Sequence, residues 1–246
     1  MLLAWIIGFS LLGSVGALSL AALLLVVPAE RRQGALPAFL GYATGVLLAT
    51  AFLGILPEAL EALAPQRVFA TLLGAIVVFF VLEKLIRWHH HNGHTHKAAG
   101  PLVLMGDAVH ILVDGVVVAA AFLTSVPLGI AAGIAVAAHE IAHKLGDYAI
   151  LLDSGYSPWS AYRLSLLTSL PGPIGAVVAY FSLGPIQGVG PYLLAVAAGS
   201  FIYIANADLV PELQARPGPT SFLMQVAWLV IGIGTVLVLH WALPMH

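Results

Sequence analysis

Long apolar runs recur along this chain and constrain its fold more than any other feature. Eight windows of about twenty mostly apolar residues can be drawn, and each is long enough to cross a lipid bilayer as a helix. Only 8% of the residues are charged and 61% are hydrophobic, whereas a soluble domain carries about 25% charged residues. We therefore expect an all-α, polytopic membrane protein that has lipid as its solvent.

The expected spans form a single transmembrane domain, separated by short segments that contain proline, glycine and charged residues. They cover residues 2–27, 37–63, 68–88, 101–124, 128–152, 159–182, 192–210 and 222–242. The first has no basic start and no small-residue cleavage site, so we interpret it as a retained span rather than a signal peptide.

Missing residue types and motifs narrow the chemistry that this chain can carry out. Cysteine is absent, so a metal would have to be held by His, Asp, Glu, Asn or Met side chains. The net charge is only −2, which argues against nucleic acid as a partner. No phosphate-binding G-x-x-x-x-G-K-[S/T] motif occurs, so ATP-driven transport within this chain is not expected, nor is an organic cofactor.

Basic residues predict how the chain is oriented in the membrane. With eight spans, most of them fall on one side, and the positive-inside rule makes that side cytoplasmic. These residues are Arg31, Arg32, Lys84, Arg87, Lys97, Arg163 and Arg216, whereas Arg67 falls on the other side. Both termini are then non-cytoplasmic, and we expect a multi-pass protein of the cell membrane.

Spans two and seven share a short pattern that indicates an internal repeat. In both, a glycine precedes a Pro-Glu pair by 12 positions, from Gly45 to Pro57 and from Gly199 to Pro211. The two spans run in opposite directions, so the repeat would be inverted, a design that transporters use around a central site. It predicts a 3+2+3 arrangement with spans four and five in the middle, unless the short match arose by chance.

Ionisable side chains gather in spans four and five. In span four they are three and seven positions apart and share one helix face: Asp107, His110 and Asp114. In span five, three residues at four-residue intervals share a face, and two more lie about 100° round the helix. The three are His139, His143 and Asp147, and the two are Glu140 and Lys144.

The two groups are expected to meet near the middle of the bilayer. A short turn near residues 124–128 joins the spans, and His110 and His139 each lie roughly 20 Å from it at 1.5 Å rise per residue. Unpaired charge at that depth costs at least about 2.5–3.5 kcal/mol per residue, and a bound cation would compensate for it. His and carboxylate ligands suit zinc, with iron, cobalt and nickel nearly as well.

Each of these residues also has a structural interpretation. A single intramembrane histidine is often a hydrogen-bonded core residue, and Asp114 could cap a kink at Gly115. Glu140 and Lys144 could form an i, i+4 ion pair. The convergence of several histidines and acids at one depth favours the metal site.

A second cluster of histidines lies between spans three and four, in a segment at residues 89–97 that the orientation places in the cytoplasm. His-rich tracts commonly bind metal, although this one could also be a solvated linker. The residues are His89, His90, His91, His94 and His96.

These motifs resemble those of the ZIP (Zrt/Irt-like) family of metal transporters. Span four reads H-I-L-V-D-G from His110, against the family's H-N-x-x-D-G, and span five reads H-E-I-A-H-K-L-G-D from His139. The second resembles H-E-I-P-H-E-L-G-D of the LIV-1 branch. The likeness extends over all eight spans, the His-rich loop and the A-D-L-V-P-E segment around Asp208.

The resemblance implies a function and roles for residues. It implies import of a divalent metal toward the cytosol, usually zinc but also Fe²⁺, Mn²⁺, Co²⁺ or Cd²⁺, often by a homodimer. A first site would use His110, Asp114 and His143, and Glu140 would belong to a second site that shares His143, with His139 beside them. The metal ligands predicted here are therefore His110, Asp114, His139, Glu140 and His143. Further pathway residues would be Asp107, Lys144, Asp147 and Asp208.

The chain departs from the family pattern at several positions. Ile111 stands where the family has Asn, Ala142 where it has Pro, and Lys144 where it has Glu. In span two, the family's Asp and His fall at Thr50 and Gly54, so the usual contribution to the entrance is missing. We expect Lys144 to pair with Glu140 and to leave room for one central metal ion rather than two; the alternative is that Lys144 faces away and balances Asp147.

Two other classes of protein share parts of the pattern. His139 to His143 also reads H-E-x-x-H, the zinc motif of metalloproteases, in which glutamate activates water. An intramembrane protease would need an Asp well after that motif, whereas Asp114 precedes it. The H-x-x-x-D of span four also resembles metal exporters of the cation diffusion facilitator type, which have six spans and a cytosolic domain.

Overall fold

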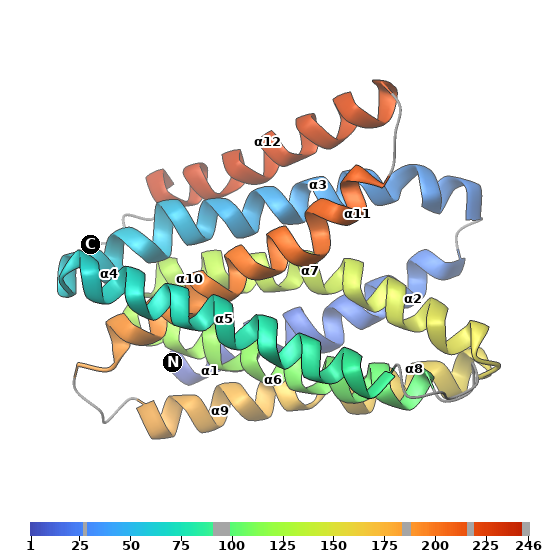
Figure 1. Cartoon of the computed structure of the whole chain (residues 1–246), viewed down its shortest axis with the longest axis horizontal. Helices are drawn as coiled ribbons and strands as arrows, with labels where there is room; N and C mark the ends of the chain where they lie inside the picture. The colour runs from blue at the N-terminus through green and yellow to red at the C-terminus, as the bar shows by residue number, and fades with distance from the viewer. Residues whose placement is uncertain (27–28, 91–98, 184–187, 216–218, 243–246) are drawn as a thin grey trace.

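The computed structural model describes residues 1–26, 29–90, 99–183, 188–215 and 219–242. All the regular structure in these segments is helical, and the helices run roughly side by side along one axis (Figure 1). Eight of the described stretches are long and apolar enough to cross a membrane, which confirms the expected all-α fold with eight spans. They are Leu2–Leu24, Leu36–Ala62, Pro65–Leu85, Leu104–Thr124, Val126–Leu152, Pro158–Leu183, Gly190–Gln214 and Phe222–Ala242.

Several spans are built from more than one helical segment. The α-helices are α1 (Leu2–Leu11), α2 (Ala17–Val26), α3 (Ala29–Ala49), α4 (Leu56–Ala62), α5 (Pro65–His90), α6 (Ala99–Thr124), α7 (Val126–Asp153), α8 (Pro158–Ser169), α9 (Pro171–Leu183), α10 (Gly190–Ile204), α11 (Val210–Gln214) and α12 (Pro219–Ala242). Wider π-helical turns at Leu12–Gly16, Thr50–Ile55 and Ala205–Leu209 join α1 to α2, α3 to α4 and α10 to α11.

The π-helical turns of spans two and seven occupy matching positions. Each ends two residues before the Pro-Glu pair, at Pro57 and at Pro211. Proline has no N–H to continue the helical hydrogen-bond ladder, so an inserted residue is most easily absorbed just before it. The sequence placed the end of span seven at residue 210, whereas the helix continues through Pro211 to Gln214.

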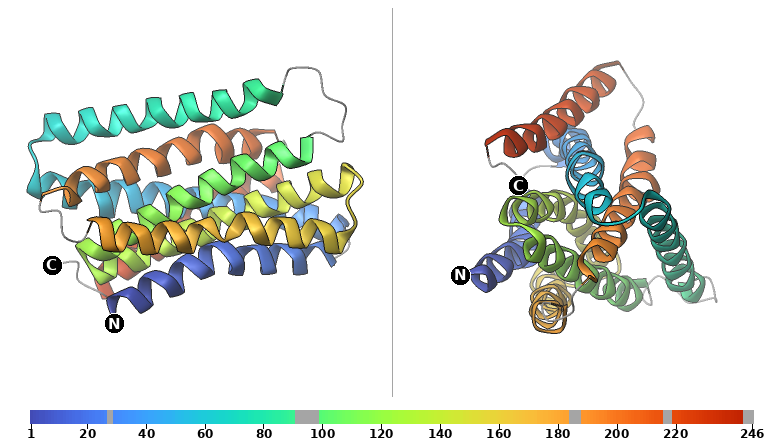
Figure 2. Two further views of the ribbon diagram at one scale, coloured as in Figure 1. Left: turned by 90° about the horizontal axis from the view of Figure 1, so that it is seen from below. Right: turned by 90° about the vertical axis from the view of Figure 1, so that its left-hand side faces the viewer.

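Spans four and five lie in the interior of the bundle, while α5 and α12 lie at its edge (Figure 2). α6 packs mainly against α9 and α7, and α7 packs against α2 and α3. Only 11% of the apolar window of either α5 or α12 is buried, so these two helices present most of their surface outward. An interior pair of helices is where polar residues can be kept from lipid.

Glycine fixes how α6 lies against α9. A Cβ atom built on Gly115 would lie 2.0 Å from the carbonyl oxygen of Gly172, so the two backbones touch at this point. Small residues at helix interfaces allow such close approach in membranes. The close contact sets the position and rotation of the helix that carries His110 and Asp114.

Candidate metal site

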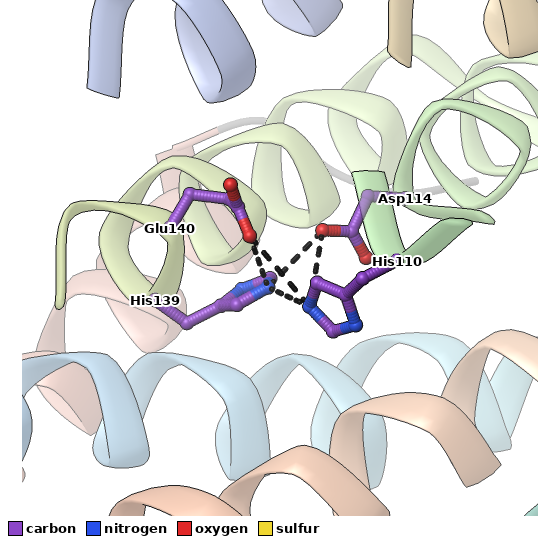
Figure 3. Close-up of side chains that lie close together, drawn as sticks. All are labelled: His110, Asp114, His139 and Glu140. Atoms are coloured by element: carbon purple, nitrogen blue, oxygen red, sulfur yellow. Dashed lines mark hydrogen bonds and ion pairs between the residues drawn. The ribbon is translucent and has the colours of Figure 1, made fainter. Parts of the chain in front are cut away.

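Four side chains from α6 and α7 point toward one another (Figure 3). His110 and Asp114 lie one turn apart on α6, and His139 and Glu140 are neighbours on α7. The two helices are joined at Ser125, whose side chain accepts a hydrogen bond from the backbone N–H of Leu128 and caps the start of α7. This tight connection brings the middles of both helices to the same level, as the equal distances from the turn predicted.

Most of the distances among these side chains are close to those between the ligands of one zinc ion. One donor atom from each of the four residues lies within 4.8 Å of all the others. His110 Nε2 is 3.3 Å from His139 Nε2, and these two nitrogens lie 3.7 and 3.1 Å, respectively, from Asp114 Oδ2. Glu140 Oε1 lies 3.6 Å from the first nitrogen and 3.7 Å from the second. A tetrahedral zinc site with bonds of about 2.0–2.1 Å has donor atoms about 3.3–3.4 Å apart.

His139 is oriented by its other ring nitrogen. Its Nδ1 lies 3.0 Å from the backbone oxygen of Ala135, which can only accept a hydrogen bond, so Nδ1 carries a proton. In the neutral ring, Nε2 then presents a lone pair toward Asp114 Oδ2 and His110 Nε2. Such a backbone contact holds the tautomer and ring plane of metal-binding histidines. A cation at the centre would remove the repulsion between this lone pair and the Asp114 carboxylate.

Glu140 is buried without a hydrogen bond. The residue is 1% exposed, and neither carboxylate oxygen has a hydrogen-bond partner within the described part of the chain. A small cavity of about 10 Å³ borders it and is also lined by Ser10, whose buried hydroxyl likewise has no partner there. A carboxylate removed from water is costly unless it is paired or coordinates a cation.

His143 lies beside these four residues. Its ring centre is 5.3 Å from that of His110 and 5.7 Å from that of His139. The Nε2 atom is buried, and no described group hydrogen-bonds to it. The three imidazoles therefore form one cluster, with His139 among the four convergent donors and His143 next to them.

Lys144 does not pair with Glu140, contrary to the prediction from their i, i+4 spacing. Its Nζ lies 2.5 Å from Asp107 Oδ2 on α6, and the same oxygen accepts a hydrogen bond of 2.5 Å from the hydroxyl of Thr168 on α8. The rotation of α7 against α6 decides the difference, because it directs Glu140 at the histidines and Lys144 at Asp107. The spacing of residues along one helix does not predict how that helix is rotated against its neighbour.

A cavity of about 270 Å³ adjoins the site on one side. It is lined by His110 and His143, by three of the predicted pathway acids and by residues of α5 and α10. The acids are Asp107, Asp147 and Asp208, and α5 adds Glu83, which accepts a hydrogen bond from the hydroxyl of Tyr203. All of these residues lie in the halves of their helices nearest to the His-rich segment.

Comparison with known proteins identifies the family of this chain. The model of the ZIP zinc transporter family matches residues 2–101 and 89–240, almost the whole chain. The chain belongs to the ZIP family. The zinc transporter ZIP13 of Pongo abelii is 34% identical over 248 residues, which make up 91% of this chain and 75% of that protein.

Other ZIP relatives are matched over shorter stretches. The zinc transporter foi of Drosophila melanogaster is 37% identical over 61% of this chain, and the human zinc transporter ZIP5 is 38% identical over 60%. The chain spans three quarters of the Pongo protein but only 21% and 29% of these two.

Membership of the ZIP family settles the choice between classes of protein. The family consists of metal transporters rather than enzymes, so the H-E-x-x-H pattern does not mark a protease. The likeness to cation diffusion facilitators is likewise limited to the short span-four pattern, because the ZIP family match runs through all eight candidate spans.

Two residues of the site were not predicted from the sequence, and one predicted segment is mostly not described by the structure. Thr168 and Ser10 come from spans six and one, and nothing in their sequence context distinguishes them from other serines and threonines in apolar helices. The His-rich loop at 89–97 falls mostly outside the described residues, which end at His90 in α5 and resume at Ala99 in α6. Metal binding there stays a prediction.

Proposed function

We propose that this protein carries a divalent transition metal, with zinc as the main substrate, across a membrane through the His/carboxylate site on α6 and α7. The observation that carries the proposal is the set of four donor atoms from two neighbouring spans, all within 4.8 Å of one another. The ligands would be those four residues together with the adjacent imidazole: His110, Asp114, His139, Glu140 and His143. Membership of a zinc transporter family supports the same substrate.

The choice of zinc follows from the donor set. Imidazole nitrogen and carboxylate oxygen in a tetrahedral arrangement are typical of zinc sites, and thiolates are not available. Fe²⁺, Mn²⁺, Co²⁺ and Cd²⁺ are the competing substrates, because they can bind the same imidazole and carboxylate donors. Which of these metals a site selects depends on its geometry and on metal availability as well as on the donors.

Transport would run toward the cytosol. The acid-lined cavity lies between the site and the side that holds the His-rich segment and most of the basic residues, which the positive-inside rule makes cytoplasmic. Metal leaving the site would meet Asp107, Asp147 and Asp208 on that route, and then the His-rich loop. We expect a homodimer in the cell membrane with both termini outside.

Uptake into proteoliposomes tests the proposal. The full chain, reconstituted with a zinc-sensitive dye inside, should take up zinc, with Fe²⁺, Mn²⁺, Co²⁺ and Cd²⁺ as competitors. His110→Ala and Asp114→Ala each remove one of the four convergent donors, so uptake at low zinc should fall on the order of 10–100-fold or more. His240→Ala is a matched control, because His240 is an exposed residue at the end of α12. Unchanged uptake by Asp114→Ala would show that the site is wrong.

A further inference from the structure

A lysine is completely buried next to the proposed metal site. Lys144 is 0% exposed, and its ammonium group lies 2.5 Å from Asp107 Oδ2. Asp107 is 9% exposed, and its Oδ2 atom also accepts the Thr168 hydroxyl. One carboxylate oxygen is therefore held by a cation and by a neutral donor, from α7 and α8.

Without Lys144, Asp107 would be well placed to bind metal. It lies one turn before His110 on α6 and lines the same cavity as His110, His143 and Asp147. His143 Nε2 is buried there without a hydrogen-bond partner among the described residues. Imidazole and carboxylate at this position are the donor types that a divalent ion takes.

The charges of the site balance one divalent ion. Asp114 and Glu140 are the two buried carboxylates among the four convergent donors, and neutral histidines add no charge. Two negative charges match one M²⁺ ion. Asp107 and Lys144 form a separate neutral pair, so the carboxylate one turn before His110 adds no net charge that would offset the repulsion between two close divalent ions.

We propose that Lys144 is a built-in counter-cation that occupies Asp107 and thereby limits the centre to one divalent metal ion. The inference rests on the function proposed above and concerns the number of ions that the same site holds. Lys144 fills the place that a second metal would take on Asp107, and it is fixed there because it belongs to the helix that carries His139, Glu140 and His143.

A purely structural role for the pair would have a different consequence. If the pair only ties α6 to α7 and α8, replacing Lys144 would lower stability and leave the number of bound ions at one. If Lys144 sets the charge, freeing Asp107 should create a second metal position, and neutralising Asp107 as well should remove it again.

Metal content after equilibrium dialysis against Zn²⁺ separates these cases. All proteins compared are the full chain with the five histidines of residues 89–96 replaced by serine, because that tract would bind metal itself. The parent should hold one zinc ion per chain, Lys144→Met two, and the double variant Asp107→Asn with Lys144→Met one. Lys144→Gln, which keeps an N–H donor for Asp107 but no charge, serves in place of Lys144→Met if that variant does not fold, and should also hold two.

The outcomes separate failure of the inference from failure of the proposed function. Two zinc ions in the parent, or one in a folded Lys144→Met or Lys144→Gln variant, would overturn the inference and leave the transport site intact. No bound zinc in the parent would overturn both. Two ions in the double variant would also overturn the inference, because Asp107 would then not be the ligand that Lys144 blocks.

Discussion

His139 uses its two ring nitrogens for different purposes. Nδ1 contacts the Ala135 carbonyl within its own helix, and Nε2 lies 3.1–3.7 Å from the donor atoms of three other residues. The family resemblance assigned His143 to the metal and placed His139 beside it. The structure makes His139 the more convergent of the two, with His143 adjacent by ring contact.

This difference gives a prediction about the two histidines. His139→Ala removes a donor that three others surround, so zinc affinity should fall on the order of 10–100-fold, at least as much as for His143→Ala. Competition with a zinc chelator measures the zinc affinity of each variant, in the full chain with the five histidines of residues 89–96 replaced by serine. Normal zinc binding by His139→Ala together with loss of binding by His143→Ala would contradict the prediction.

Sequence spacing predicts which residues share a helix face but not which partner each one meets. The intervals among Asp107, His110 and Asp114 were sufficient to place these residues on one face of span four, and equal distances from the turn were sufficient for the depth of the site. The partners of Glu140 and Lys144 were not predictable. Both lie about 100° round α7 from the histidine face. Only the packing of α7 against α6 and α8 determines that Glu140 lies near the histidines and that Lys144 pairs with Asp107.

At the scale of helices, small residues decide where α6 lies. The Gly115–Gly172 contact allows no Cβ, because the nearest atom is a backbone carbonyl oxygen only 2.0 Å away and cannot move aside like a side chain. Gly115 directly follows Asp114, one of the four convergent donors, so any separation of α6 from α9 would also shift the candidate metal site.

Gly115→Ala should therefore destabilise the protein. The added methyl group forces α6 and α9 apart, and overpacking of this kind costs about 1–3 kcal/mol. Gly74→Ala is the matched control, because a Cβ there meets nothing within 4 Å and alanine favours the helix by up to about 1 kcal/mol. Thermal unfolding of the detergent-solubilised protein measures both. Equal melting temperatures for the two variants would mean that the α6–α9 contact is not a constraint.

The proposed inverted repeat gains support from how the helices pack. Span two packs against α12, and span seven packs against α5, which are equivalent pairs if spans one to three repeat as six to eight. The matched glycines serve the same purpose in each pair. A Cβ on Gly45 would lie 2.2 Å from the Leu229 carbonyl oxygen, and one on Gly199 would lie 2.8 Å from the Ala75 side chain. The Gly-to-Pro spacing was the basis for expecting this repeat, and the 3+2+3 arrangement stays a prediction. The spacing did not predict the π-helical turns.

For the whole molecule, two larger cavities beside α6 differ in chemistry. The cavity of about 270 Å³ is lined by four acids and two histidines. A second cavity, of about 280 Å³, lies at the opposite ends of α6 and α10, and the described residues of its lining, which include Leu123, Thr124 and Leu183, are not ionisable. At the level of that cavity, Phe122 is buried and packs against Phe9. The acidic cavity, whose lining includes His110 and His143, therefore adjoins the candidate site from one side of the bundle.

Because the chain contains no cysteine, single introduced cysteines can test which side that is. Val109 is 40% exposed and lines the acidic cavity next to His110, whereas Leu123 lines the opposite cavity. In sealed right-side-out vesicles, an impermeant maleimide added outside should label Leu123→Cys and spare Val109→Cys. A permeant maleimide should label both.

Protection of Val109→Cys by zinc tests whether the ion binds next to this cavity. An ion held by His110 lies beside position 109, so zinc inside the vesicle should slow labelling of Val109→Cys by the permeant reagent and leave Leu123→Cys unaffected. The control is Val109→Cys combined with Asp114→Ala, in which the weakened site should no longer protect the cysteine. Labelling of Val109→Cys from outside would reverse the orientation, because the acidic cavity would then be an entrance and metal would leave past the apolar side. Protection that persists in the Asp114→Ala background would place the bound ion somewhere other than the four convergent donors.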